Sequence, residues 1–213
     1  MMAVVSMMTT LIVHAQIEPQ VIEVLKKSQE KMSSPDGTEM EMTVDVTLMV
    51  KLTGMKIKCS EKGNKLRLNM ESKVMGQEVM VETGFDGYQE WRYIHRKDKD
   101  DKAMRDTLTI IKTTKKPKNE HSVNFDVYKD YKTAKIKIDG KYYAITLTRP
   151  VEKDSPSKMV MLIDKDNYRF HEMKTKVKGI TMTMRMTKFK YGVNDDVFVL
   201  DMKQYPNAVV VRK

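Results

Sequence analysis

The residues of this chain that are most able to do chemistry are its 20 methionines, four histidines and one cysteine. Residues 181–187 read Thr-Met-Thr-Met-Arg-Met-Thr, which places three thioethers at alternate positions. Thioethers are soft ligands that suit Cu(I). No other soft ligand stands near this run, and the core of a β-sheet needs the same spacing. We therefore interpret these methionines as apolar lining and predict no metal site.

Catalytic patterns are equally weak. The histidines form no His-x-x-x-His or Glu-x-x-His pattern of a metal site, and there is no Gly-x-Ser-x-Gly nucleophile motif or glycine-rich phosphate loop. Cys59 alternates with apolar residues, which predicts a buried free thiol. A hydrolase would lack a nucleophile, so we predict that the chain is not an enzyme and needs no cofactor. The four histidines are His14, His95, His121 and His171.

A two-residue alternation of apolar and polar side chains runs along most of the chain, and it predicts strands with one apolar face. A helix is expected before them, over 18–32, opened by Pro19 and ended by the Ser-Ser-Pro-Asp-Gly run at 33–37. About ten strands then follow one another with short turns, including Asp-Gly turns at 86–87 and 139–140. The rhythm of the turns favours a barrel or a strongly curved sheet.

The segment 95–131 interrupts this pattern with a charge run and a few apolar residues. A long interruption in a β domain is often a functional loop. We expect it to cover the apolar side of the sheet as a lid. The residues assigned to this lid are Leu108, Ile110, Ile111, Phe125 and Tyr128.

The apolar face itself is predicted from the alternating residues, and Trp91 and Tyr93 are placed on the same side. Methionine is flexible and fills irregular space, so such a face can hold a ligand of ill-defined shape, such as an acyl chain. An ordinary closed core explains the same residues. The predicted lining is Met40, Met42, Val44, Val46, Leu48, Leu66, Leu68, Trp91, Tyr93, Met182, Met184 and Met186.

Residues 1–15 are apolar and end in Val-His-Ala before Gln16, which is typical of a signal peptide cleaved near Ala15–Gln16. The basic start of such a peptide is missing, so either the start codon is misplaced upstream or this segment is not a signal peptide, and we favour the first interpretation. The division is therefore 1–15 as signal peptide and 16–213 as a single domain, exported and soluble. The net charge of +10 is spread along the chain among acids, so nucleic acid is not expected as a partner, and weak attraction to anionic membranes is a secondary possibility.

Several segments of the sequence, taken in their order along the chain, resemble the outer-membrane lipoprotein carrier family, LolA/LolB-like. The resemblance rests on the helix after a leader, the Lys-Leu-Arg-Leu strand at 65–68, the Asp-Gly-x-x-x-Trp-x-Tyr stretch at 86–93, the Ile-Asp hairpin at 161–173 and the Tyr-Pro-Asn-Ala-x-Val tail at 205–210. The family has a basic residue and Pro in one turn; here Lys62 and Gly63 stand nearest that place, so the family's way of locking its lid is in doubt.

The resemblance implies a mainly β (α+β) fold: an incomplete antiparallel β-barrel, or half-barrel, of about ten strands with an N-terminal helix and lid segments. It implies a monomeric periplasmic carrier that binds acyl chains of lipoproteins or lipids and escorts them toward the outer membrane. An inner-membrane release complex and an outer-membrane acceptor are the implied protein partners. A sensor or binding module of the cell envelope, with no transport role, is the alternative, and the resemblance does not identify the lipid.

Overall fold

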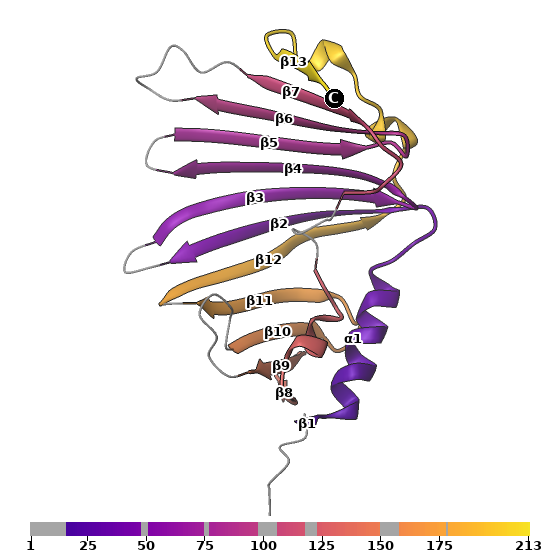
Figure 1. Cartoon of the computed structure of the whole chain (residues 1–213). Coiled ribbons are helices and arrows are strands. Elements are labelled where there is room, and N and C mark those ends of the chain that lie inside the picture. Colours follow the sequence, from indigo (N-terminus) through magenta and orange to yellow (C-terminus); the bar gives the residue numbers. More distant parts are fainter. Residues whose placement is uncertain are drawn as a thin grey trace, which may run out of the picture.

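In the part of the chain that the structure describes, the computed structural model contains one long, curved sheet with a single α-helix at one side (Figure 1). The thirteen strands of these described residues hydrogen-bond in the order β1-β8-β9-β10-β11-β12-β2-β3-β4-β5-β6-β7-β13, so the sheet is open and its ends are β1 and β13. All neighbours are antiparallel except the two end pairs, β1 with β8 and β13 with β7. The predicted half-barrel is therefore confirmed. The structure describes residues 16–47, 51–74, 77–97, 106–117, 123–149, 158–177 and 179–213.

The strands follow the turns read from the sequence, with glycine at positive φ in the turns at Gly87, Gly140 and Gly179. Asp86 fixes the first of these turns by accepting the N–H groups of Tyr88 and Gln89, both at 2.9 Å. The strands are β1 (Gln16–Ile17), β2 (Thr38–Thr47), β3 (Lys51–Lys62), β4 (Lys65–Val74), β5 (Gln77–Phe85), β6 (Gln89–Lys97), β7 (Thr107–Lys112), β8 (Thr133–Asp139), β9 (Tyr142–Thr148), β10 (Lys158–Asp164), β11 (Phe170–Val177), β12 (Ile180–Tyr191) and β13 (Val209–Arg212).

The predicted helix is α1 (Pro19–Lys31), and Pro19 stands at its start, where a missing N–H costs nothing. Its buried residues are Val21, Val24, Leu25 and Ser28, at the i, i+3, i+4, i+7 spacing of one helix face. The described residues also form three short 3₁₀ helices: η1 (Val127–Asp130), η2 (Asp195–Phe198) and η3 (Met202–Gln204).

Some expectations differ from the structure. The segment 95–131 is not wholly irregular, because residues 107–112 form β7 and pair with β6. Glycine often marks a turn and predicts one near residue 54. Gly54 instead lies inside β3 opposite Asp45, with no positive φ. The short β1 and β13 were also missed, since strands of two and four residues carry too little alternation to be seen.

Two apolar clusters lie on opposite faces of the sheet. We call the face that packs against α1 the inner face; its cluster runs from Val21 and Leu25 of the helix across the sheet to Leu66 and Phe85. We call the opposite face the outer face. There Trp91, Leu108, Ile110 and Tyr205 form the second cluster, with residues of the C-terminal segment packed against it.

Candidate functional site

The inner face carries a ladder of methionines and aliphatic residues. Cross-strand register sets Met184 opposite Val44, and Met42 opposite both Met186 and Ile57. Ile57 in turn faces Met70 on β4. Side chains that are directly opposite in an antiparallel sheet share a face, so the alternation read from the sequence becomes one continuous surface over four strands.

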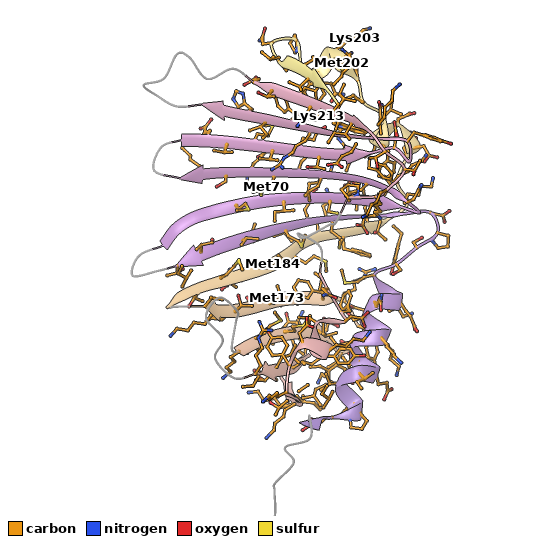
Figure 2. The ribbon with its side chains drawn as sticks, in the orientation of Figure 1. Met70, Met173, Met184, Met202, Lys203 and Lys213 are labelled. Atoms are coloured by element: carbon orange, nitrogen blue, oxygen red, sulfur yellow. The ribbon has the colours of Figure 1, made fainter. Side chains whose placement is uncertain are left out.

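The same surface extends on the other side of β12. Met173 lies opposite Met184, and Met161 lies opposite Met173. Figure 2 labels Met70, Met173 and Met184, which come from three strands of the sheet. The predicted lining omits Met55, Met70 and Met173, which polar neighbours mark as one-sided, and also Met159 and Met161, whose continuous apolar run 159–163 does not show which side each residue faces.

Burial along this face is graded. Met42 is 1% exposed and Val44 is 3% exposed, whereas Met70 and Met186 are only half-buried. Met182 is 39% exposed. The inner face is thus a packed core at its centre and an apolar surface in contact with solvent toward the first residues of β12.

The helix and the segment 123–131 cover one part of this face. Val21, Val24 and Leu25 of α1 join the same cluster as Phe125, and Tyr128 packs against it. A small cavity of about 150 Å³ lies beside this cover, between Met32, Met40, Val123 and Phe125. Phe125 and Tyr128 are therefore placed where a cover of the apolar face must be, and their role as a lid stays a prediction.

Other members of the predicted lid lie elsewhere. Leu108 and Ile110 point to the outer face, because they are opposite Tyr93 and Trp91 of β6. They cannot cover the methionines of the inner face. Ile111 lies opposite Glu90, on the inner side at the far end of the sheet. The prediction placed all three in a loose cover, whereas strand pairing sends alternate residues to opposite faces.

The placement of Trp91 and Tyr93 beside the methionines is wrong. Trp91 is opposite Gly84, and Gly84 is opposite Arg67, a row on the outer face. The inner-face row that contains Met40 passes instead through Leu68 to Thr83 on β5 and Arg92 on β6. The remaining predicted residues that the structure describes share the inner face, and Leu48 lies outside the described residues. Those residues are Met40, Met42, Val44, Val46, Leu66, Leu68, Met182, Met184 and Met186.

The outer cluster is organised around a buried carboxylate. Glu82 accepts hydrogen bonds from Trp91 Nε1–H at 3.3 Å and from the Tyr205 hydroxyl, and it pairs with Arg67 at 3.0 Å. Burial and the hydrogen bond to Glu82 raise the pKa of Tyr205. Arg67 also donates to the Val197 carbonyl at 3.0 Å. These contacts fix the C-terminal segment to the sheet, which is a structural role.

A second polar group borders this cluster. His95 Nδ1 lies 2.7 Å from Asp106, and Tyr93 donates to the same carboxylate at 2.7 Å. Burial and Asp106 raise the pKa of Tyr93 to about 12. The backbone carbonyl of Asp106 accepts the N–H of Val209 at 2.7 Å, so the group helps to hold β13 at the edge of the sheet.

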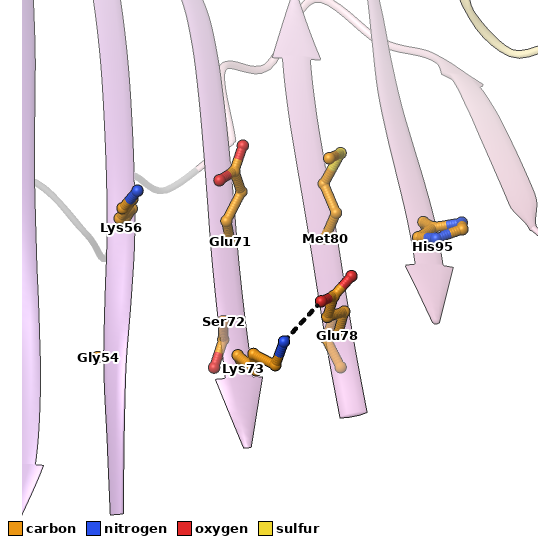
Figure 3. A pocket seen from close by; sticks show the side chains of 9 residues that line it. Gly54, Lys56, Glu71, Ser72, Lys73, Glu78, Met80 and His95 are labelled. Atoms are coloured by element: carbon orange, nitrogen blue, oxygen red, sulfur yellow. Dashed lines mark hydrogen bonds and ion pairs between the residues drawn. The ribbon is translucent and has the colours of Figure 1, made fainter. Parts of the chain in front are cut away.

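Shallow hollows lie on the outer face. One, of about 460 Å³, is lined by Lys56, Glu71, Met80 and His95, which Figure 3 shows side by side on four strands. Another, of about 430 Å³, lies between His95 and residues 204–207. Among the described residues no three His, Cys, Asp or Glu side chains are grouped to hold a metal ion. None of the described helices is long and apolar enough to span a membrane.

No protein-family model and no curated protein matches the sequence. Among solved structures, an uncharacterised conserved protein from Thermus thermophilus is 13% identical, with a TM-score of 0.49 over 91% of this chain and 99% of that chain. The lipoprotein LppX of Mycobacterium tuberculosis is 14% identical, with a TM-score of 0.48 over 84% and 100%. A LolA superfamily protein from Nitrosomonas europaea is 12% identical, with a TM-score of 0.31 over 84% and 97%.

These likenesses concern the fold alone. A LolA superfamily protein and a mycobacterial lipoprotein are among them, and all three TM-scores are below 0.5. The identities and TM-scores are too low to carry an argument about function, which rests on the chain's own residues.

Proposed function

We propose that the inner face binds the acyl chains of lipids or lipoproteins, and that the protein carries them through the periplasm toward the outer membrane. The observation that supports this proposal is the partly exposed methionine surface around Met70, Met182 and Met186. Burying an acyl chain is favourable by about 0.8 kcal/mol for each CH₂ removed from water. A face that is already apolar and partly exposed provides this gain without burying polar groups.

The chemistry of methionine fits a carrier. Its unbranched side chain adapts to neighbours of irregular shape, so one surface can accommodate chains of different length. A carrier must also release its load, and adaptable contacts lose less on release than a rigid, closely fitted pocket. In this proposal residues 16–213 act as one exported domain, the leader 1–15 is removed, and α1 with Phe125 and Tyr128 forms the cover.

Native mass spectrometry of the purified protein tests the proposal directly, because a carrier should retain lipid or lipopeptide. Binding of a fluorescent long-chain fatty acid then tests the face. Met70→Lys should weaken binding about tenfold or more, since it places an ammonium group on the apolar surface. Glu71→Lys is the matched control, because Glu71 is the next residue of β4 and lies exposed on the outer face.

Circular dichroism must show that both variants are folded. Equal affinities of the two folded variants for the fatty acid would contradict the proposal. Absence of any bound lipid together with no affinity of the wild-type protein would contradict it as well.

A further inference from the structure

A group of lysines distinguishes the outer face of β8, β10 and β11. Lys158 of β10 lies directly opposite Lys176 of β11. Lys174 lies on the same face, two residues before Lys176, and is opposite Val160. Val160 is opposite Thr146, which is opposite Lys135 of β8. We call these four exposed lysines the lysine face.

The lysine face differs in its pairing from the outer face of the adjacent strand β12. Both lysines of β12 have acid partners, because Lys190 pairs with Glu39 and Lys188 pairs with Glu41, each at 3.1 Å. On β3, Lys58 also pairs with Glu39 at 3.1 Å, whereas Lys56 forms no ion pair with a described residue. Within the described part of the chain, none of the four lysines of the lysine face forms an ion pair or side-chain hydrogen bond.

Among the described residues, two acids on the outer face of the neighbouring strands are already engaged. Arg185 binds Glu172 at 2.6 Å and Asp45 at 3.0 Å, so one guanidinium holds both carboxylates. Like charges directly opposite in a sheet are destabilising. The Lys158–Lys176 pair therefore costs stability in the isolated protein, and an external anion would relieve that cost.

The surface between these lysines suits a broad, flat partner. Threonines fill much of it, with Thr146 and Thr148 on β9 and Thr181 on β12 in the same rows. Two half-buried apolar residues of β10, Val160 and Leu162, lie on the same face. Hydroxyl donors, free ammonium groups and a few aliphatic side chains together match the headgroup region of a phospholipid layer.

We propose that the lysine face docks the protein on a bilayer that contains anionic phospholipids. The positive charge by itself indicates an anionic partner. The choice of a bilayer rests on the proposed function, because a carrier of acyl chains takes them from one membrane and delivers them to another. Basic residues near an anionic leaflet contribute roughly fivefold each to membrane partitioning. The inner face stays turned away from the membrane contact, since it is the opposite side of the same sheet.

Co-sedimentation with vesicles tests this inference. The probes are vesicles of phosphatidylcholine alone and of phosphatidylcholine with a third of phosphatidylglycerol, each at low and at physiological salt. The test variant replaces Lys135, Lys158, Lys174 and Lys176 by Gln. The matched control replaces four exposed lysines elsewhere, Lys26, Lys112, Lys115 and Lys203, and lowers the net charge by the same amount.

The wild-type protein should bind the anionic vesicles, less strongly at higher salt, and the test variant should bind about tenfold or more weakly. The control should bind nearly as the wild type does. Equal weakening of both variants would show that net charge alone attracts the protein, and would overturn the inference. No binding of the wild-type protein to anionic vesicles, or stronger binding to a soluble polyanion such as heparin than to vesicles, would overturn it too.

Fatty-acid binding separates this inference from the proposed function. The test variant should bind the fluorescent fatty acid as tightly as the wild type. Met70→Lys should lose the fatty acid but keep its affinity for anionic vesicles. If the fatty acid does not bind at all while the vesicles do, the carrier proposal fails and the docking surface stands.

Discussion

The two apolar clusters on opposite faces of one sheet are built from different residues. The outer cluster is aromatic and anchored by polar groups: the indole of Trp91 and the hydroxyl of Tyr205 both bond to Glu82. The inner cluster contains Met40, Met42 and Met184, with half-buried methionines at its margin. Hydrogen bonds to a buried carboxylate specify one geometry, whereas thioethers pack without directional demands. The same sheet thus has a fixed side and an adaptable side.

The largest expected difference between the two sides is in stability. Trp91 is fully buried, so Trp91→Ala should reduce the free energy of unfolding by about 3–5 kcal/mol. Met70→Ala removes a half-buried side chain and should cost about 1–2 kcal/mol, below the range for fully buried methionine. Urea denaturation measures both values. Similar costs for the two substitutions would mean that the clusters are equally well packed, and the contrast would fail.

Two glycines within strands allow a second test of how rigidly the outer cluster is packed, with a smaller expected change in the free energy of unfolding. A Cβ at Gly84 would lie 2.0 Å from Trp91 Cζ2, so Gly84→Ala must displace the indole and should cost about 1–3 kcal/mol. Gly54 also lies inside a strand, β3, but a Cβ there would lie 3.9 Å from its nearest neighbouring atom. Gly54→Ala should leave stability unchanged or raise it by a few tenths of a kcal/mol, because alanine has less freedom in the unfolded chain.

The unfolding midpoints of the two glycine variants in urea measure this difference. The tryptophan fluorescence of Gly84→Ala should also differ from that of the wild type. A native-like spectrum and midpoint for Gly84→Ala would show that the outer cluster is as adaptable as the inner one.

The smallest expected effect is on how the stability of the protein changes at low pH. Burial favours the neutral form of Glu39, but Lys190 and Lys58 outweigh it and lower its pKa. A carboxyl whose pKa is lower in the folded protein stabilises the fold above its unfolded pKa, about 4.3. This stabilisation disappears as the pH falls through the folded value. Glu39→Gln should therefore lose less stability than the wild type between about pH 6 and pH 3.

Urea unfolding at several pH values gives the result, with Glu71→Gln as the control, because Glu71 is exposed and pairs with no group in the described residues. The control should keep the pH dependence of the wild type. An unchanged pH dependence in Glu39→Gln would contradict the stabilising role of the ion pairs that Lys58 and Lys190 make with Glu39.

The sequence was sufficient for the local features of this protein. Alternation over 40–48 and 181–187 predicted strands with methionine on one face, because successive side chains of a strand must point to opposite sides. Pro19 and the glycine turns predicted where the helix begins and where the hairpins reverse. These features depend on backbone geometry within a few residues, so they can be read without knowing what the rest of the chain does.

Tertiary structure decided which face each strand contributes to. Trp91 and Met184 are both apolar residues in alternating strands, and nothing within β6 says which of its two sides meets the methionines. The register with β5 sets Trp91 opposite Gly84 and sends it to the outer face. A shift of one residue would reverse every side chain of the strand.

The segments that cover the two faces are distant in sequence from the strands they cover. Tyr205 covers Trp91 from the C-terminal segment, and α1 covers the methionines from the other end of the chain. The division into a fixed and an adaptable face therefore arises only when both ends of the chain have folded onto the sheet. Local alternation determines that a strand has two faces, and long-range packing determines which of them is inside.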